Sequence, residues 1–394
     1  MTHPAPRTHS LFRRHGSHQS AKVGMVELFF DLVFVFAITQ LSHSLLQKLT
    51  PLGALQTVML LLAVWSLWNY TAWATNALDP ERIPVRLLLF VLMFGGLVVS
   101  MSIPSAFDGG AWAFAIGYVL MQGLRTGFIL WAARAEPLSR RRNFQRNLFW
   151  IAFTALFWFA GAYAEPEPRL YWWMLAIGIE FISPWLLYWT PGLGASKTAD
   201  WIVDGAHMAE RCALFVIIAL GESLLITGAT FAEQPFTAAG AVGAGTAFFG
   251  TVAMWWIYFH EGAEHAASQI EKAADPGNIA RVAYSFIHIP IVAGIVVCAV
   301  GDEIVLVHPD HADTAAIATV IGGTGLFLLG CTLFKWVSYE RRTPPLSHSA
   351  GLLALGALLA GASAHWFSTL QLGVTTAAIL IVVAVWEALV LRRS

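Results

Sequence analysis

The stretch GMVELFFDLVFVFAITQLSH, residues 24–43, is long and apolar enough to span a membrane, yet it contains charged residues. Glu27 and Asp31 are four positions apart and therefore lie on one face of a helix. Gln40 and His43 follow toward the far end of the stretch. Because a charge at the centre of a bilayer costs at least about 2.5–3.5 kcal/mol, these residues predict polar partners elsewhere in the chain.

The composition is that of an integral membrane protein. Of its 394 residues, 57% are hydrophobic and only 12% are charged, whereas a soluble domain carries roughly 25% charged residues. The net charge of -1 argues against a nucleic-acid partner. We therefore expect an all-α polytopic membrane protein whose partners are membrane lipids and an unknown small molecule or ion.

Cofactor and metal motifs do not emerge from the sequence. Cys212, Cys298 and Cys331 all fall in apolar runs, which predicts packing roles and no disulfide framework. The motif HEGAEH, residues 260–265, places its second histidine at i+5, which breaks the i, i+4 zinc-binding face of a metalloprotease helix. We expect no cofactor, no metal and no catalytic residue, although the sequence leaves enzymatic activity open.

Apolar runs of about 20 residues predict twelve transmembrane helices with both termini cytoplasmic. The predicted spans are residues 24–47, 52–76, 83–104, 111–134, 143–163, 170–190, 205–231, 237–260, 278–301, 313–337, 348–366 and 372–391. With the N-terminus inside, all lysines and arginines fall in cytoplasmic segments except Lys48 and Arg169 in outer loops and Arg125 and Arg211 within helices. This asymmetry follows the positive-inside rule and supports the predicted topology.

Four pairs of matching positions, in the same order, indicate an internal duplication. The pairs are Trp68-x-Tyr70 with Trp256-x-Tyr258, Glu27 with Glu210, Arg86 with Arg281, and AGAYA (160–164) with AGASA (360–364). Since six helices per half is an even number, the halves would share one orientation, as in parallel repeats. We therefore predict a disordered basic tail (1–23), a first six-helix repeat (24–191), a cytoplasmic linker (192–204) and a second repeat (205–394).

The opening motif also resembles a known family. VELFFDLVFVFAITQLSH (26–43) is similar to the signature of the bacterial low-temperature-requirement protein A (LtrA) family of membrane proteins. IIALGESLL (217–225) and YSFIHIPIVAGIVVCAVG (284–301) resemble later motifs of the same family. The resemblance implies an integral protein of the bacterial cytoplasmic (inner) membrane and leaves its biochemistry undefined, because the family takes its name from a growth phenotype.

Polar residues within the predicted helices are the candidate ion or substrate pathway. They are Glu27, Asp31, Gln40, His43, Asn69, Arg125, Glu180, His207, Glu210, Arg211, Glu222 and His288. At 1.5 Å of rise per residue, Asp31, Asn69 and Arg125 fall at similar depth on the cytoplasmic side of the midplane, which predicts a polar interior there. We expect Asp31 to form an ion pair with Arg125 or Arg211, because polar groups at such depth should face one another.

Several of these residues have structural alternatives. Glu27 lies close enough to the interface to cap its helix or reach the headgroups, and His288 could be a proton relay or a core histidine with both nitrogens bonded. Glu222 has no evident basic neighbour and is either a proton site or a neutral group bonded to a carbonyl. Glu210 and Arg211 point about 100° apart and should have different partners.

Two function classes fit these features. The first is a secondary transporter or ion-translocating protein that uses Asp31 and Glu222, supported by twelve helices, parallel repeats and buried carboxylates. The second is a non-transporting membrane protein, either a lipid-modifying enzyme or a scaffold supporting growth under cold stress. The sequence specifies neither the substrate nor the oligomeric state.

Overall fold

The computed structural model describes residues 10–13, 22–197, 204–260, 276–338, 343–364 and 366–391. Apart from two isolated bridges, the residues in these ranges form only helices and irregular segments. The first half contains α1 (Met25–Gln47), α2 (Pro51–Ala77), α3 (Ile83–Ser102), α4 (Ala111–Ala132), α5 (Leu138–Tyr163) and α6 (Pro166–Ile182). The second half contains α7 (Gly205–Glu233), α8 (Ala238–Phe259), α10 (Pro276–Ala280), α11 (His288–Val307), α12 (Thr314–Ser338), α13 (Leu346–Ser363) and α14 (Thr369–Leu391).

Short 3₁₀ turns and a π-helix complete the described secondary structure. The 3₁₀ turns are Ile103–Ser105 after α3 and Ala133–Ala135 after α4. A π-helical segment, η4 (Arg281–Ile287), joins α10 to α11 and makes these three segments one continuous element. The fold is therefore all-α, as predicted.

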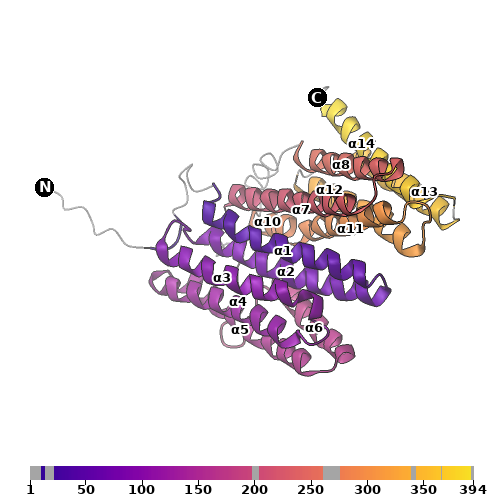
Figure 1. Cartoon of the computed structure of the whole chain (residues 1–394). Helices are drawn as coiled ribbons and strands as arrows, with labels where there is room; N and C mark the ends of the chain where they lie inside the picture. Colours follow the sequence, from indigo (N-terminus) through magenta and orange to yellow (C-terminus); the bar gives the residue numbers. More distant parts are fainter. Residues whose placement is uncertain are drawn as a thin grey trace.

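The first two helices occupy the middle of the bundle, with α3 to α6 on one side and α7 to α14 on the other (Figure 1). Helix α1 packs against α3 and α7, and α2 packs against α4, α6 and α7. Polar contacts join α1 to α7 at Glu27–His207, Asp31–Arg211 and Thr39–Glu222, in the same order along both helices. Helices α1 and α7 therefore run parallel, so they enter the membrane from the same side.

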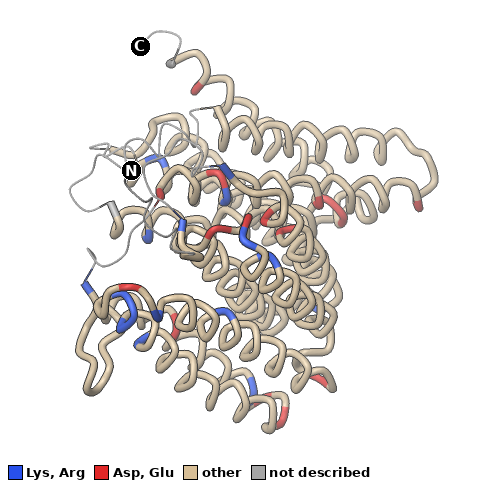
Figure 2. Tube along the Cα trace, turned by 90° about the vertical axis from the view of Figure 1, so that its left-hand side faces the viewer, with Lys and Arg blue, Asp and Glu red and all other residues tan. Residues whose placement is uncertain are grey.

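Ten helices in the described ranges are long and apolar enough to cross a membrane. Helices α5 and α6 are the two predicted spans outside that group. The first turns of α5 carry Arg140, Arg141, Arg142 and Arg146, and α6 has 17 residues, or about 26 Å at the α-helical rise. Figure 2 shows charged residues as isolated short stretches along a mostly uncharged trace. The chain is thus a multi-pass membrane protein.

The sixth predicted span has different ends in the structure. We expected residues 170–190, whereas α6 begins at Pro166 and ends at Ile182. Pro184 has no N–H, so the helical hydrogen bond from position 184 to the Glu180 carbonyl is missing. The Ser183 hydroxyl instead donates to the Glu180 carbonyl at 2.9 Å. The chain then turns through Leu187 and Tyr188, whose φ angles are 52° and 51°.

The ninth predicted span also needs correction. We expected it to end at residue 301, but α11 continues to Val307 and includes Asp302 and Glu303.

Helix α11 packs closely on α12 through glycines. A Cβ on Gly323 would lie 2.7 Å from the backbone nitrogen of Cys298, whereas one on the neighbouring Gly322 would meet nothing within 4 Å. Small residues at such contacts let helix backbones approach in a membrane, where dispersion contacts stabilise the pair.

Part of the predicted disordered tail is held against the bundle. Phe12 is buried and forms a bridge with Leu78 at the end of α2. The Arg13 backbone N–H donates to the Ala77 carbonyl at 2.9 Å, and the Arg140 guanidinium lies 4.2 Å from the Phe12 ring centroid. Residues 10–13 of this tail therefore contact the ends of α2 and α5, while residues 1–9, 14–21 and 198–203 lie outside the described ranges.

Candidate functional site

The deepest charges of the first helix meet those of α7. Arg211 Nη2 donates to Asp31 Oδ1 at 2.8 Å, and both side chains are fully buried. Trp68 Nε1 of α2 donates to the same carboxylate oxygen at 2.8 Å. This confirms the predicted ion pair for Arg211. Asp31 Oδ2 and Arg211 Nε and Nη1 have no hydrogen-bond partner among the described residues, so the pair has unused polar capacity.

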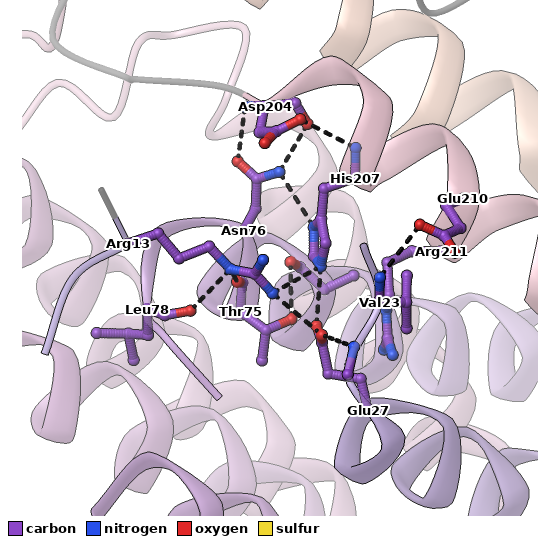
Figure 3. Close-up of polar contacts among 12 residues, drawn as sticks. Arg13, Val23, Glu27, Thr75, Asn76, Leu78, Asp204, His207, Glu210 and Arg211 are labelled. Carbon is purple, nitrogen blue, oxygen red and sulfur yellow. Dashed lines mark hydrogen bonds and ion pairs between the residues drawn. The ribbon is translucent and has the colours of Figure 1, made fainter. Parts of the chain in front are cut away.

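One turn closer to the helix starts, Glu27 and His207 form a second contact between α1 and α7 (Figure 3). His207 Nε2 lies 3.0 Å from Glu27 Oε1, and Arg13 Nη2 donates to Glu27 Oε2 at 3.1 Å. The Gly24 N–H donates to the same Oε2 at 2.8 Å, which caps α1. Glu27 therefore both caps its helix, one of its two expected roles, and joins three chain segments.

The hydrogen bonds around His207 define its tautomer. Asn76 Nδ2 donates to the Asp204 carbonyl at 2.8 Å, and Asn76 Oδ1 accepts from the Asp204 N–H at 3.1 Å, which fixes the amide orientation. The second Nδ2 hydrogen then faces His207 Nδ1 at 3.3 Å, so Nδ1 is the acceptor and Nε2 carries the proton that Glu27 accepts. Arg13 Nη2 lies 3.0 Å from His207 Nε2. The guanidinium and the imidazole are thus neighbouring groups that both donate to the Glu27 carboxylate.

A cavity lies between α2, α4, α5, α6 and residues 277–286. The cavity measures about 150 Å³, and its walls include Asn69, Arg125, Glu180 and Arg281. Three residues predicted as a pathway, Asn69, Arg125 and Glu180, therefore share one cavity. Asn76 also lines it, so the Glu27–His207 contact lies next to its wall.

Arg125 is 2% exposed and has no ion pair among the described residues. Its Nη2 donates to Gln122 Oε1, its Nη1 lies 3.4 Å from Thr71 Oγ1, and its guanidinium carbon is 5.3 Å from the Tyr70 ring centroid. The alternative predicted pairing of Asp31 with Arg125 is thus wrong. A buried guanidinium bonded only to neutral groups has capacity for an anion.

Glu180 is held by two neutral donors. The Tyr118 hydroxyl and Trp158 Nε1, the latter at 3.0 Å, donate to its two carboxylate oxygens. Arg281 is fixed by Nη1 donating to the Pro184 carbonyl and Nη2 donating to Asn278 Oδ1, each at 2.7 Å. Its Nε is buried and has no partner among the described residues.

The π-helix η4 forms part of the cavity wall and is hydrogen-bonded to α2 at Ser285. Trp65 Nε1 donates to the Ser285 carbonyl at 2.7 Å, and Trp73 Nε1 donates to the Ser285 hydroxyl at 2.9 Å. Two α2 tryptophans thus tie the first half of the chain to η4.

Left-handed backbone on the opposite wall adds a second unusual feature. Leu187 and Tyr188 both line the cavity, and non-glycine residues in this conformation cost about 1–3 kcal/mol each. The Tyr188 and Tyr70 hydroxyls lie 3.3 Å apart. Strained backbone of this kind clusters at functional sites, and here it positions a tyrosine on the cavity.

The remaining predicted residues lie outside the cavity. Thr39 Oγ1 donates to Glu222 Oε1, and Glu210 is exposed and accepts a hydrogen bond from the Val23 N–H at 3.1 Å. Gln40 is half-buried and His43 is exposed. Glu210 and Arg211 thus have different partners, as expected.

His288 is also outside the cavity, with both ring nitrogens bonded. Its Nδ1 lies 2.8 Å from the Ala283 carbonyl and must donate, so Nε2 accepts from the Tyr258 hydroxyl at 2.8 Å. This is the core-histidine arrangement.

The sequence analysis missed several polar residues. Arg13 was placed in the tail, and Lys335 was placed in a cytoplasmic segment, whereas it is buried in α12 and donates to Glu387 of α14. Lys335 and Glu387 each lie about one turn before the end of their helix. This matched depth could have indicated the pair. Arg281 was also assigned to a cytoplasmic segment, and nothing in its spacing indicated a cavity.

The described residues contain no group of three or more His, Cys, Asp or Glu side chains placed to hold a metal ion. Residues 261–265 of the HEGAEH motif lie outside the described ranges.

Fold and site together define a multi-pass α-helical membrane protein with paired charges and a polar cavity inside its bundle. The chain belongs to the family described as bacterial low temperature requirement A protein (LtrA), whose model matches residues 22–385. It is 39% identical over 386 residues to an uncharacterized protein, RA0937, of Rhizobium meliloti (strain 1021), covering 98% of this chain and 93% of that protein. No solved structure matches the chain.

Proposed function

We propose that the chain is a transporter or ion-translocating protein of the bacterial cytoplasmic membrane, built from two parallel six-helix repeats with both termini cytoplasmic. The observation that carries the proposal is the cavity at Arg125, because a buried guanidinium without an ion pair is costly inside a membrane protein. Charged residues in membrane helices almost always face the bundle interior or a water-filled cavity, where they mark substrate and ion pathways.

The repeat is supported by corresponding helix contacts in the two halves. Helix α1 contacts α3 as α7 contacts the α11 element, and α2 contacts α6 as α8 contacts α14. The consecutive pairs from α3 to α6 match those from α11 to α14 in the same way. The hydrogen bond between Thr39 and Glu222 joins positions 183 residues apart, the same offset that relates Glu27 to Glu210. An axis along the membrane normal between α1 and α7 would bring such equivalent positions together.

In this mechanism the cavity binds the solute, and the walls on either side of it change access. The left-handed Leu187–Tyr188 turn and the η4 segment are the candidate moving parts, since π-helical segments and strained backbone occur at functional sites. Glu222, whose carboxylate contacts Thr39, would exchange a proton or cation farther along α7, as access alternates. Asp31 and Glu27 would hold the α1–α7 contact.

The alternative is a lipid-modifying enzyme or a scaffold. The described residues that line the cavity include no His, Cys, Asp or Lys. A hydrolytic enzyme needs a nucleophile within reach of a base, and among those residues Glu180 is the only carboxylate, already bonded to Tyr118 and Trp158. The composition of the cavity therefore favours binding over covalent chemistry.

Flux through proteoliposomes tests the proposal. Purified full-length protein would be reconstituted with an internal pH dye, and labelled small anions and cations would be added with and without an imposed pH gradient. We expect uptake of at least one solute class above protein-free liposomes, and loss of that uptake in Arg125→Gln. Arg86→Gln, which alters an exposed pair with Glu81, is the control and should retain uptake. Equal flux in wild-type and protein-free liposomes, under every gradient, would refute the proposal.

A further inference from the structure

We infer that the cavity between α2, α4, α5, α6 and η4 is a binding site for a small monocarboxylate with a compact apolar or aromatic body. The inference names the substrate class for the proposed function and rests on it only for the statement that the bound solute is carried. Binding itself is independent of transport.

The charges around the cavity favour an anion. Three arginines, Arg125, Arg140 and Arg281, line it together with one carboxylate, Glu180. Arg140 is neutralised outside the cavity by Glu136 at 3.1 Å. The remaining balance is two guanidinium groups against one carboxylate, an excess of one positive charge, which matches a monoanion better than a dianion or a cation.

The geometry of the two guanidinium groups favours a carboxylate. Arg281 is held by the Pro184 carbonyl and Asn278, which leaves its buried Nε–H without a partner among the described residues. Arg125 has five N–H donors and, among the described residues, its hydrogen bonds go only to Gln122 and Thr71. Planar guanidinium donors match the two oxygens of a carboxylate. Glu180 does not compete for them at ion-pair distance, because no ion pair joins it to either arginine within the described ranges.

The walls determine the rest of the ligand. Trp65, Trp73, Phe181 and Phe286 line the cavity, and the N–H groups of both tryptophans are already bonded to Ser285. Their rings therefore present apolar surface. A cavity of about 150 Å³ accommodates a benzene-sized molecule, so a ligand of the size of benzoate fits and a long acyl chain does not.

Binding measured on the purified full-length protein in detergent tests the inference. Isothermal titration with benzoate would be compared with benzamide, its neutral isostere, and with benzylammonium, a cation of similar size. We expect benzoate to bind at least tenfold more tightly than either. Arg125→Gln and Arg281→Gln should each weaken benzoate binding by at least tenfold, and Arg86→Gln should leave it unchanged.

Folding and transport are separated from binding by design. If Arg125→Gln does not fold, Arg281→Gln is the variant that tests the inference, because residue 281 is only half-buried. Benzamide binding as tightly as benzoate, or tighter binding of benzylammonium, would overturn the inference. Benzoate binding without carboxylate flux in liposomes would refute transport and leave this site standing. Cation flux without benzoate binding would refute the carboxylate site and leave the transport proposal standing.

Discussion

Replacing Asp31 by Asn tests the buried ion pair directly. The substitution keeps the side-chain volume and an oxygen for the Trp68 hydrogen bond, but it removes the charge that faces Arg211 at 2.8 Å. Because both side chains are fully buried, Arg211 would be left as an uncompensated charge. Breaking a buried pair in this way costs about 3–5 kcal/mol, which corresponds to about two to four orders of magnitude in the ratio of folded to unfolded protein.

The magnitude is best measured as a double-mutant cycle. We expect Asp31→Asn and Arg211→Gln each to lower the free energy of unfolding by about 3–5 kcal/mol. The double variant should cost less than the sum of the two, because it leaves neither member of the pair as an unpaired buried charge. Unfolding would be followed by tryptophan fluorescence and circular dichroism during titration of detergent-solubilised protein with sodium dodecyl sulfate.

An exposed ion pair supplies the matched control. Arg86 and Glu81 are also 2.8 Å apart, but their side chains are 41% and 68% exposed. Glu81→Gln should therefore change the free energy of unfolding by no more than about 1 kcal/mol. The reasoning fails if Asp31→Asn is no more destabilising than Glu81→Gln, or if the costs of Asp31→Asn and Arg211→Gln are additive in the double variant.

Three further predictions concern packing, transport and the N-terminal segment. Gly323→Ala should lower the free energy of unfolding by about 1–3 kcal/mol, because its Cβ would press on the α11 backbone. Gly322→Ala has open space around the new Cβ and should leave the free energy of unfolding unchanged or raise it by up to about 1 kcal/mol. Equal effects of the two substitutions in the same detergent titration would contradict the close helix contact. Glu222→Gln should fold normally and abolish the pH dependence of liposome flux, and unchanged flux would make the residue structural. Arg13→Gln should destabilise the protein by more than 1 kcal/mol, because Arg13 is 7% exposed and pairs with the buried Glu27, whereas the same change at the half-exposed Arg82 should have little effect; similar unfolding curves for the two variants would show that the segment is dispensable.

The helical class and most helix positions could be predicted from the sequence because apolar length is a local property. Membrane backbone must satisfy its own hydrogen bonds, so each apolar run defined a helix. Helix ends were less predictable where a local exception occurred. At α6 the Ser183–Pro184 pair ended the helix early, and at α11 the helix continued through Asp302 and Glu303, which composition alone had assigned to a loop.

The Asp31–Arg211 pair could be predicted because depth follows from counting residues along a helix. Depth did not separate Arg211 from Arg125, however, because the choice depends on which helices are neighbours. The cavity was predictable only in part for the same reason. Asn69, Arg125 and Glu180 were recognised as buried polar residues, whereas Arg281 enters the cavity through a π-helical segment that follows from no simple periodicity.

The carboxylates of α1 have a structural role that explains their position near the helix start. Buried ion pairs often add little stability over apolar residues of the same volume, and their best-attested use is to specify which elements pair and in what register. Here Glu27 contacts His207 and Asp31 contacts Arg211, one turn apart on both helices. Sliding α7 by one residue would separate both pairs at once and leave buried charges unpaired. The α1–α7 contact is therefore suited to act as a fixed axis in the proposed transport mechanism, in which the strained and π-helical walls of the cavity are the proposed moving parts.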